Sequence, residues 1–255
     1  MTMSSLNRKN GPGTRTAFSR LLTFALLGIM FISSFASIAM LATQGDGPLD
    51  LGTFGGTELR QSNVNSFISE WNTSLTSSGS SASNQVALPL LENGTYDFNV
   101  DWGDSSTNLI TSWNQSEVTH TYASEGVYTI NITGTIKGWC FNDGGDKLKI
   151  LDISQWGNLS LGNAGYYFNG CTNFNVTATD SPDLTGTTNF EDMFGYATSF
   201  NGSIGHWDLA NAINLGGLFI GASSFNQDIS NWNLSNVNTT RGMFYEASSF
   251  NQPIG

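Results

Sequence analysis

The densest group of oxygen-bearing side chains in the sequence lies at Asp97, Asn99, Asp101 and Asp104. Carboxylate oxygens are ligands that Ca²⁺ prefers, so one interpretation is a calcium site at Asp97, Asp101 and Asp104. The spacing does not match an EF-hand loop, and no Glu completes the ligand set. The alternative is a tight turn whose Asp side chains accept hydrogen bonds from backbone N–H groups. The sequence favours this second interpretation.

The chain has two histidines, His120 and His206, and neither stands in a pattern typical of catalysis. A catalytic histidine needs a nucleophile and an orienting carboxylate, and no motif places a Ser or Cys beside either ring. The sequence also lacks a glycine-rich phosphate loop and a cysteine cluster with metal-binding spacing. We therefore expect no enzyme activity, no catalytic residue and no cofactor other than the candidate calcium ion.

The two cysteines, Cys140 and Cys171, allow either one disulfide or two thiols. A disulfide is permitted outside the cell, but both cysteines lie beside apolar or turn segments that suit burial of a free thiol. The sequence favours two buried thiols.

Asn-x-Ser/Thr sequons make the chain a candidate glycoprotein in a host that glycosylates asparagine. They begin at Asn72, Asn93, Asn114, Asn131, Asn158, Asn175, Asn201, Asn233 and Asn238.

A repeat indicates the elements that would position these groups. Phe200, Phe225 and Phe250 recur at a fixed step of 25 residues, and each is followed by Asn. Such a period is typical of a solenoid, in which each coil is too small to bury its own apolar side and stacks on its neighbours. The repeated aromatic residues are then expected to form the core. They are Phe174, Phe194, Phe200, Phe219, Phe225, Phe244, Phe250, Trp207 and Trp232.

Each coil is expected to contain a short extended segment and a short helical turn. Residues 229–237 alternate in a way that suits a bent strand, and residues 239–248 carry Met243, Phe244 and Ala247 at helical spacing. Equivalent aromatic residues would lie about 4.8 Å apart along the stack, which is the spacing of strands in a sheet.

The N-terminus has the layout of an export signal. Four basic residues precede a charge-free run at residues 21–43. Residues 1–43 are therefore interpreted as either a cleaved signal peptide or an uncleaved anchor helix that holds the chain in the membrane. Both place the remainder outside. That remainder contains all 20 acidic residues of the chain, which argues against nucleic acid and anionic lipid as partners.

Residues 44–65 show little periodicity and are interpreted as a linker. The segment that follows has β-like runs broken by turn clusters, and apolar and polar residues alternate at 96–102 and 127–136. These runs predict a small antiparallel β-sandwich at residues 66–136, followed by a repeat region at residues 137–255. The predicted fold class is mainly β: a signal or anchor helix, a β-sandwich and a repeat solenoid.

Two known families are similar to these segments. VDWGDSS (100–106) and THTYASEGVYTINITG (119–134) resemble the polycystic-kidney-disease-type (PKD-type) β-sandwich, although Ser105 stands where that family usually has Gly. The repeats, of the form MFxxAxSFNxxIxxWxLSNV, resemble the BspA-type leucine-rich-repeat surface proteins, also known from mycoplasma lipoprotein repeats. The resemblance covers about residues 66–255. It implies a cell-surface protein that acts in adhesion or host and matrix contact, without a known active site.

We expect an extracellular or cell-surface protein that binds a protein or glycan ligand through the solenoid. Two alternatives stay open: a structural scaffold of the envelope, and the non-catalytic part of a larger secreted hydrolase. The last residues, FNQPIG, repeat the start of a coil and do not resemble a polar cap. We therefore also expect the native protein to continue beyond residue 255, and the isolated chain to self-associate through an exposed apolar end.

Overall fold

The computed structural model describes residues 64–254, which belong to one compact unit. The predicted signal or anchor segment and almost all of the predicted linker lie outside the described residues. Among the residues described, no helix is long and apolar enough to cross a membrane. This part of the chain is mainly β, and its helical element is the short 3-10 helix η1 (Ser116–Val118).

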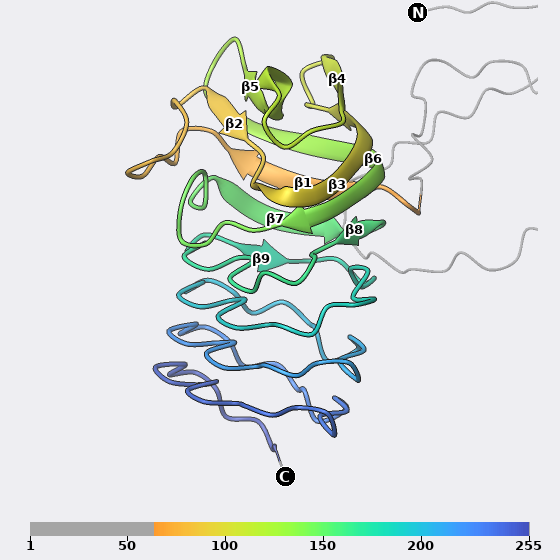
Figure 1. The fold of residues 1–255 in the computed structure, drawn as a ribbon. Helices are drawn as coiled ribbons and strands as arrows, with labels where there is room; N and C mark the ends of the chain where they lie inside the picture. Colours follow the sequence, from red (N-terminus) through yellow and green to blue (C-terminus); the bar gives the residue numbers. More distant parts are fainter. Residues whose placement is uncertain (1–63, 255) are drawn as a thin grey trace, which may run out of the picture. The chain divides into compact units, whose positions relative to one another are not determined.

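Most strands belong to one seven-stranded sheet (Figure 1). They lie in the order β4, β3, β6, β1, β7, β9, and β8 pairs with β6 beside this path. β2 and β5 form a separate two-stranded sheet. The strands are β1 (Phe67–Asn72), β2 (Gln85–Ala87), β3 (Leu90–Asp101), β4 (Thr107–Ile110), β5 (Thr119–Thr121), β6 (Val127–Trp139), β7 (Ile150–Gln155), β8 (Leu159–Ser160) and β9 (Asn175–Val176).

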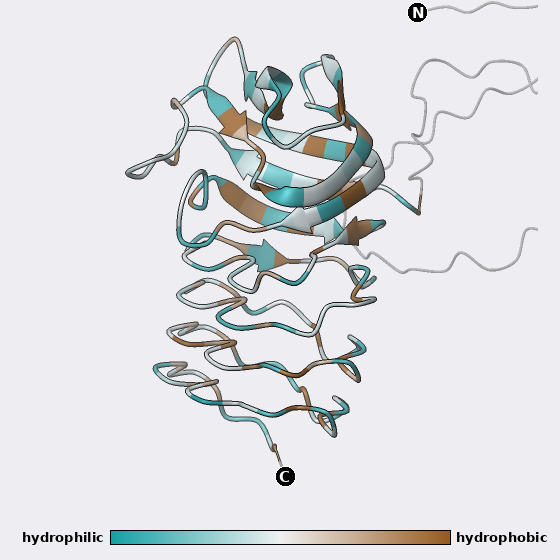
Figure 2. Ribbon diagram, in the orientation of Figure 1, coloured by the Kyte–Doolittle hydropathy of each residue, from teal (hydrophilic) through white to brown (hydrophobic). Residues whose placement is uncertain are grey.

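Alternating apolar and polar residues explain the two longest strands, and Figure 2 shows both kinds along the strands of the sheet. In β3, Tyr96, Phe98 and Val100 are buried, whereas Asp97 and Asn99 are exposed. Successive side chains of a strand point to opposite faces, so this pattern gives the sheet one apolar face. β3 and β6 pair antiparallel over most of the two predicted runs, which confirms that these runs are strands.

The sheet continues from the predicted sandwich into the predicted repeat region. The predicted boundary between residues 136 and 137 falls inside β6, which ends at Trp139. β1 pairs with β6 on one side and with β7 on the other. The core is continuous in the same way, because the ring of Phe67 contacts those of Trp139 and Trp156, with centroids 5.1 and 6.5 Å apart.

After β7 the chain forms stacked coils with little regular secondary structure (Figure 1). Backbone N–H groups of one coil donate to carbonyl oxygens of the next. Phe194 donates to Leu218 and Phe219 donates to Met243, both at 2.9 Å. Isolated β-bridges join Asn214 to the coils before and after it. Because these contacts join residues about one repeat apart, the 25-residue period of the sequence is the period of the stack.

The predicted helical turn at residues 239–248 is wrong, and residues 229–237 contain turns where an extended segment was expected. Gly242 (φ 65°) and Glu246 (φ 59°) have left-handed backbone conformations. An α-helix requires negative φ at every position, so these two residues prevent one from forming between them. The segment forms hydrogen-bonded turns instead, in which the N–H of Tyr245 donates to Gly242 at 3.0 Å and the N–H of Ala247 donates to Phe244 at 3.1 Å.

Aromatic side chains form two columns inside the stack. The Phe before Asn in each coil forms the first column, with ring centroids 5.7–5.9 Å apart. The Phe six residues earlier forms the second, with centroids 5.6–6.0 Å apart. These spacings exceed the expected value of about 4.8 Å because the nearly parallel rings are offset, as stacked aromatic rings prefer. The columns are Phe174, Phe200, Phe225, Phe250 and Phe168, Phe194, Phe219, Phe244.

Most of the aromatic residues expected in the core are buried. Trp207 and Trp232 retain 3% and 8% of their accessible surface, and the Phe residues of the earlier coils retain none. Phe244 and Phe250, which lie in the last coil, are partly buried against this core. The degree of burial therefore falls toward the end of the stack.

Candidate interaction site on the coil stack

The oxygen cluster singled out in the sequence forms a capped turn. Asp101 accepts the backbone N–H of Gly103 at 3.0 Å, and Asp104 accepts the N–H and the hydroxyl of Ser106 at 3.0 and 2.5 Å. Asp97 is exposed on β3. In the part of the chain that the structure describes, no group of three His, Cys, Asp or Glu side chains could hold a metal ion. The geometry fits turn capping, and the calcium interpretation stays a prediction.

His120 lies against this turn from β5. Its Nε2 atom is 2.8 Å from Asp104 Oδ2 and 3.4 Å from Ser106 Oγ, and its ring stacks on Trp102 with centroids 4.8 Å apart. In a catalytic triad the carboxylate and the nucleophile contact opposite imidazole nitrogens. Here both contact the same nitrogen, so the group lacks that geometry. It connects the turn to the two-stranded sheet.

The pKa of Asp104 reflects these contacts. Burial acts to raise it, but the hydrogen bonds from Ser106 and His120 and the charge of His120 lower it overall.

The other histidine, His206, is exposed, and its Nε2 atom lies 3.1 Å from the backbone oxygen of Asp180. The structure therefore keeps the two histidines in separate surroundings.

Both cysteines are free thiols, in agreement with the preference drawn from the sequence. Cys171 is fully buried, and Cys140 is half-buried and donates to the carbonyl oxygen of Gly165 at 3.2 Å. Burial raises the pKa of Cys140 to about 11 and raises the pKa of Cys171 well above its usual value. Because the thiolate is the reactive form, neither cysteine is suited to act as a nucleophile near neutral pH.

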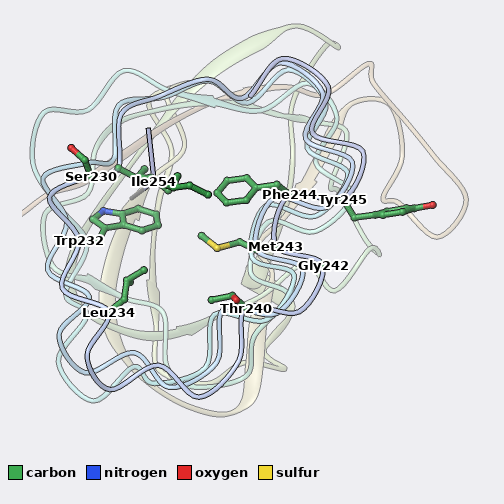
Figure 3. Close-up of a pocket in the computed structure, with 10 residues that line it drawn as sticks. Ser230, Trp232, Leu234, Thr240, Gly242, Met243, Phe244, Tyr245 and Ile254 are labelled. Atoms are coloured by element: carbon green, nitrogen blue, oxygen red, sulfur yellow. The ribbon is translucent and has the colours of Figure 1, made fainter. Parts of the chain in front are cut away.

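The last coil leaves an apolar cavity of about 730 Å³ open to solvent (Figure 3). Trp232, Met243 and Phe244 point into this space, whereas Tyr245 points away from it. Ile254 lies at its edge and is 65% exposed. In the earlier coils, aromatic rings of the following coil cover the equivalent position. The last coil thus presents an apolar surface that is covered elsewhere in the stack.

The same coil carries backbone donors that have no acceptor in the described part of the chain. In the coil before it, the N–H groups of residues 215, 217, 219 and 221 donate to carbonyl oxygens of the last coil at 2.8–2.9 Å. The equivalent N–H groups of residues 240, 242, 244 and 246 have no acceptor within residues 64–254. The end of the stack therefore combines exposed apolar side chains with a row of backbone N–H donors. The edge strand of a sheet presents a similar row of donors.

A second repeated feature is a row of asparagines. The Asn that follows each Phe of the first column accepts, through Oδ1, the backbone N–H of the Asn one coil later. The three successive distances are 3.0, 2.9 and 2.8 Å. We call this row the asparagine column; it consists of Asn175, Asn201, Asn226 and Asn251. The sequence showed the repeated Phe-Asn pair, but only the structure shows that its Asn links the coils.

One buried ion pair was not predicted from the sequence. Lys149 Nζ lies 3.3 Å from Asp146 Oδ1, and both side chains are fully buried. Lys149 also donates to the backbone oxygens of Ser81, Ala82 and Gln85 at 2.8–3.0 Å. Burial outweighs the attraction of Asp146 and lowers the pKa of Lys149. The pair fastens residues 81–85 to the core, and the sequence gives no signal of it because most of its partners are backbone atoms.

A search of curated proteins and a search of solved structures each return no match to the chain. The similarities to the PKD-type and BspA-type families therefore stay predictions. A family model does match residues 148–255, which comprise β7, β8, β9 and the coils that follow. This part of the chain is similar to the family described as Mycoplasma protein of unknown function, DUF285.

Proposed function

We propose that the chain is an exported cell-surface protein that binds a protein or glycan ligand through a leucine-rich-repeat-like solenoid. The observation that carries this proposal is the division of each coil into two parts. The interior holds the columns of Phe rings, and the exterior repeats polar groups from coil to coil. Stacked repeats create extended surfaces of this kind, which such proteins use for binding.

The proposed role of the seven-stranded sheet is to close one end of the solenoid. β7 pairs with β1 on one side and with β9, in parallel, on the other. The sheet thereby covers the apolar side of the first coil, as the terminal cap of a repeat protein does. The lateral surface of the coils is available to a ligand.

Export is supported by the four basic residues ahead of the charge-free run at 21–43. A periplasmic-type reporter enzyme fused after residue 60 should be active on the outer side of the membrane. A matched fusion in which Leu26 and Leu27 are replaced by Asp should stay inside, because charge in the apolar run prevents insertion. A reporter active only in the cytoplasm in the unaltered fusion would contradict export.

Binding is tested by displaying the full chain on a non-adherent host cell and measuring its attachment to immobilised matrix proteins and glycans. Soluble chain should compete for attachment, and the same chain after thermal unfolding should not. Equal attachment by cells with and without the chain, on every surface of both kinds, would refute a binding function.

A second candidate function is a structural scaffold of the envelope, in which the stack of coils spaces other domains. Its support is the regular stacking, in which backbone N–H groups of one coil donate to carbonyl oxygens of the next. The two candidates differ in one property that the display assay measures: a scaffold needs no external ligand, whereas a binding protein attaches to one.

A further inference from the structure

The asparagine column has hydrogen-bonding capacity that the packing of the coils does not use. In Asn175, Asn201 and Asn226, the side-chain oxygen accepts from the next coil, and the Nδ2 amino group is the remaining end of each amide. No acceptor for these nitrogens lies within residues 64–254. Asn175 and Asn226 are half-buried residues, yet their nitrogens are not among the buried atoms without a partner. The column therefore offers solvent-accessible donors, one in each coil.

The donors of Asn201 and Asn226 are held in fixed positions. Besides the backbone N–H, Gln227 Nε2 donates to Asn201 Oδ1 at 3.0 Å, and Gln252 Nε2 donates to Asn226 Oδ1 at 3.1 Å. Two hydrogen bonds to one oxygen fix the orientation of each amide and therefore the position of its nitrogen. A ligand that accepts from such a group loses little side-chain freedom on binding, which favours affinity.

We propose that the asparagine column binds a linear, uncharged polysaccharide that lies along the axis of the stack. This inference rests on the proposed binding function and names the class of its ligand. Hydroxyl and ring oxygens recur at every sugar unit of such a chain and accept hydrogen bonds. An extended glycan presents such oxygens along its whole length, so several of its sugar units can accept from the column at once.

The spacing of the column disfavours an extended peptide. Successive coils are joined by backbone hydrogen bonds and β-bridges, as strands are in a sheet, so the column advances by about 4.8 Å per coil. In a β-strand, carbonyl groups on one edge recur after two residues, or about every 6.6 Å. The mismatch of about 1.8 Å per coil accumulates to about 5 Å over the three steps of the column, which is more than the narrow range of hydrogen-bond lengths allows.

The charge of the coils decides between neutral and anionic glycans. Residues 150–254 contain eight Asp and Glu residues and one Arg, and they contain no Lys. A polyanion such as a uronic-acid chain would meet a surface of its own sign, and like charges brought together oppose binding. An uncharged chain avoids this repulsion and is the ligand that the surface fits.

The test compares two double variants of the full chain, which is kept in a detergent without a sugar headgroup. In N201D/N226D the carboxylate still accepts from the next coil and from glutamine, but the Nδ2 donors are lost. In N231D/N233D the same charge is added at exposed asparagines outside the column. Titration calorimetry measures binding of cellohexaose and chitohexaose, with an alginate oligosaccharide as the anionic probe.

The unaltered chain should bind one of the neutral hexasaccharides more tightly than its disaccharide and should not bind alginate. N201D/N226D should bind about tenfold more weakly, which corresponds to two hydrogen bonds of ordinary net strength. N231D/N233D should stay within about twofold of the unaltered chain, since its changes leave the column donors in place. Both variants should retain the thermal unfolding midpoint of the parent, which shows that the coils are intact.

Two results would overturn the inference. One is the absence of binding to both hexasaccharides by the folded, unaltered chain. The other is equal weakening in the two double variants, which would assign the effect to charge. If the chain still attaches to matrix proteins in the display assay, the proposed binding function survives and only the glycan assignment fails. If it attaches to no surface, both fail.

Discussion

At the scale of single residues, two positions in each coil have left-handed backbone conformations. They are two residues before and two residues after the Phe of the second column, and glycine holds only some of them. The pairs are Tyr166 and Gly170, Asp192 and Tyr196, Gly217 and Gly221, and Gly242 and Glu246, with φ between 46° and 75°. A residue with a Cβ atom is strained in this conformation, whereas glycine is not.

We expect Glu246→Gly to stabilise the chain by about 0.5–1 kcal/mol, because it removes this strain at an exposed position. Gly242→Ala should destabilise it by a similar amount. A Cβ atom there would meet nothing closer than Tyr245 Cβ at 4.0 Å, so the effect comes from the backbone alone. Urea denaturation measures both, and Glu246→Ala is the control that keeps the Cβ. An equal gain from Glu246→Ala would contradict this account.

The lowered pKa of Asp104 predicts that the stability of the folded chain depends on pH. Its pKa is lowered in the folded state, so the folded chain binds a proton less readily than the unfolded chain. The resulting stabilisation is present above the ordinary Asp pKa of about 3.9 and is lost as the pH falls through the lower folded value. Asp104→Asn should therefore flatten the fall in stability below about pH 4. Denaturation curves recorded at several pH values test this.

Asp97→Asn is the matched control for Asp104, because Asp97 is exposed on the neighbouring strand β3. It makes the same change of charge but leaves the contacts of Asp104 with Ser106 and His120 in place. The variant Asp104→Asn and the parent chain could lose stability to the same extent as the pH falls below about 4. In that case other carboxyl groups must account for the acid sensitivity.

At the scale of elements, the aromatic columns predict unequal costs of truncation along the stack. Phe225→Ala and Trp232→Ala should each lower the free energy of unfolding by about 3–5 kcal/mol, as for other large buried aromatic residues. Phe250→Ala should lower it less, since Phe250 is only partly buried. Chemical denaturation gives the three values. A midpoint that Phe225→Ala leaves unchanged would show that the columns do not hold the coils together.

The sequence was sufficient to predict the columns because their period depends only on which residue types recur. It also predicted the strands at 96–102 and 127–136 from their alternation. It failed for residues 239–248, where Met243, Phe244 and Ala247 have helical spacing but left-handed neighbours exclude a helix. Spacing reports which side chains share a face, whereas it does not report the sign of φ at a residue such as Glu246.

Other features depend on contacts between distant residues, which the sequence does not reveal. Pro182 takes the place of the repeated Trp in one coil, and the structure brings Trp156 and Trp207 from the flanking coils together, with centroids 5.4 Å apart. The Asn that follows each column Phe was visible as a repeated residue. Its role in linking coils was not, because the acceptor and the donor lie about 25 residues apart.

At the scale of the whole molecule, the open end of the last coil predicts self-association of the isolated chain. Apolar side chains and unpaired N–H groups lie together there, and both are stabilised by contact with another copy. The apparent mass from light scattering should rise with concentration. Ile254→Asp should reduce this rise, because it places a charge at the edge of the apolar cavity.

Leu109→Asp is the control for this experiment, since Leu109 is 54% exposed on β4, at the other end of the described unit (Figure 1). It should leave the concentration dependence unchanged. A monodisperse monomer at high concentration would contradict self-association of the isolated chain.

The ammonium group of Lys149 has a consequence for the conditions in which this chain stays folded. Carbonyl oxygens of Ser81, Ala82 and Gln85, a hydroxyl and a carboxylate surround it, much as oxygen ligands surround a bound metal ion. A loop closed by a metal opens when the free ion becomes scarce, because binding follows mass action. A cation that is part of the chain cannot be diluted or captured by a chelator. Closure of this loop therefore does not depend on the concentration of free metal ions, and EDTA should leave its protection from hydrogen exchange unchanged.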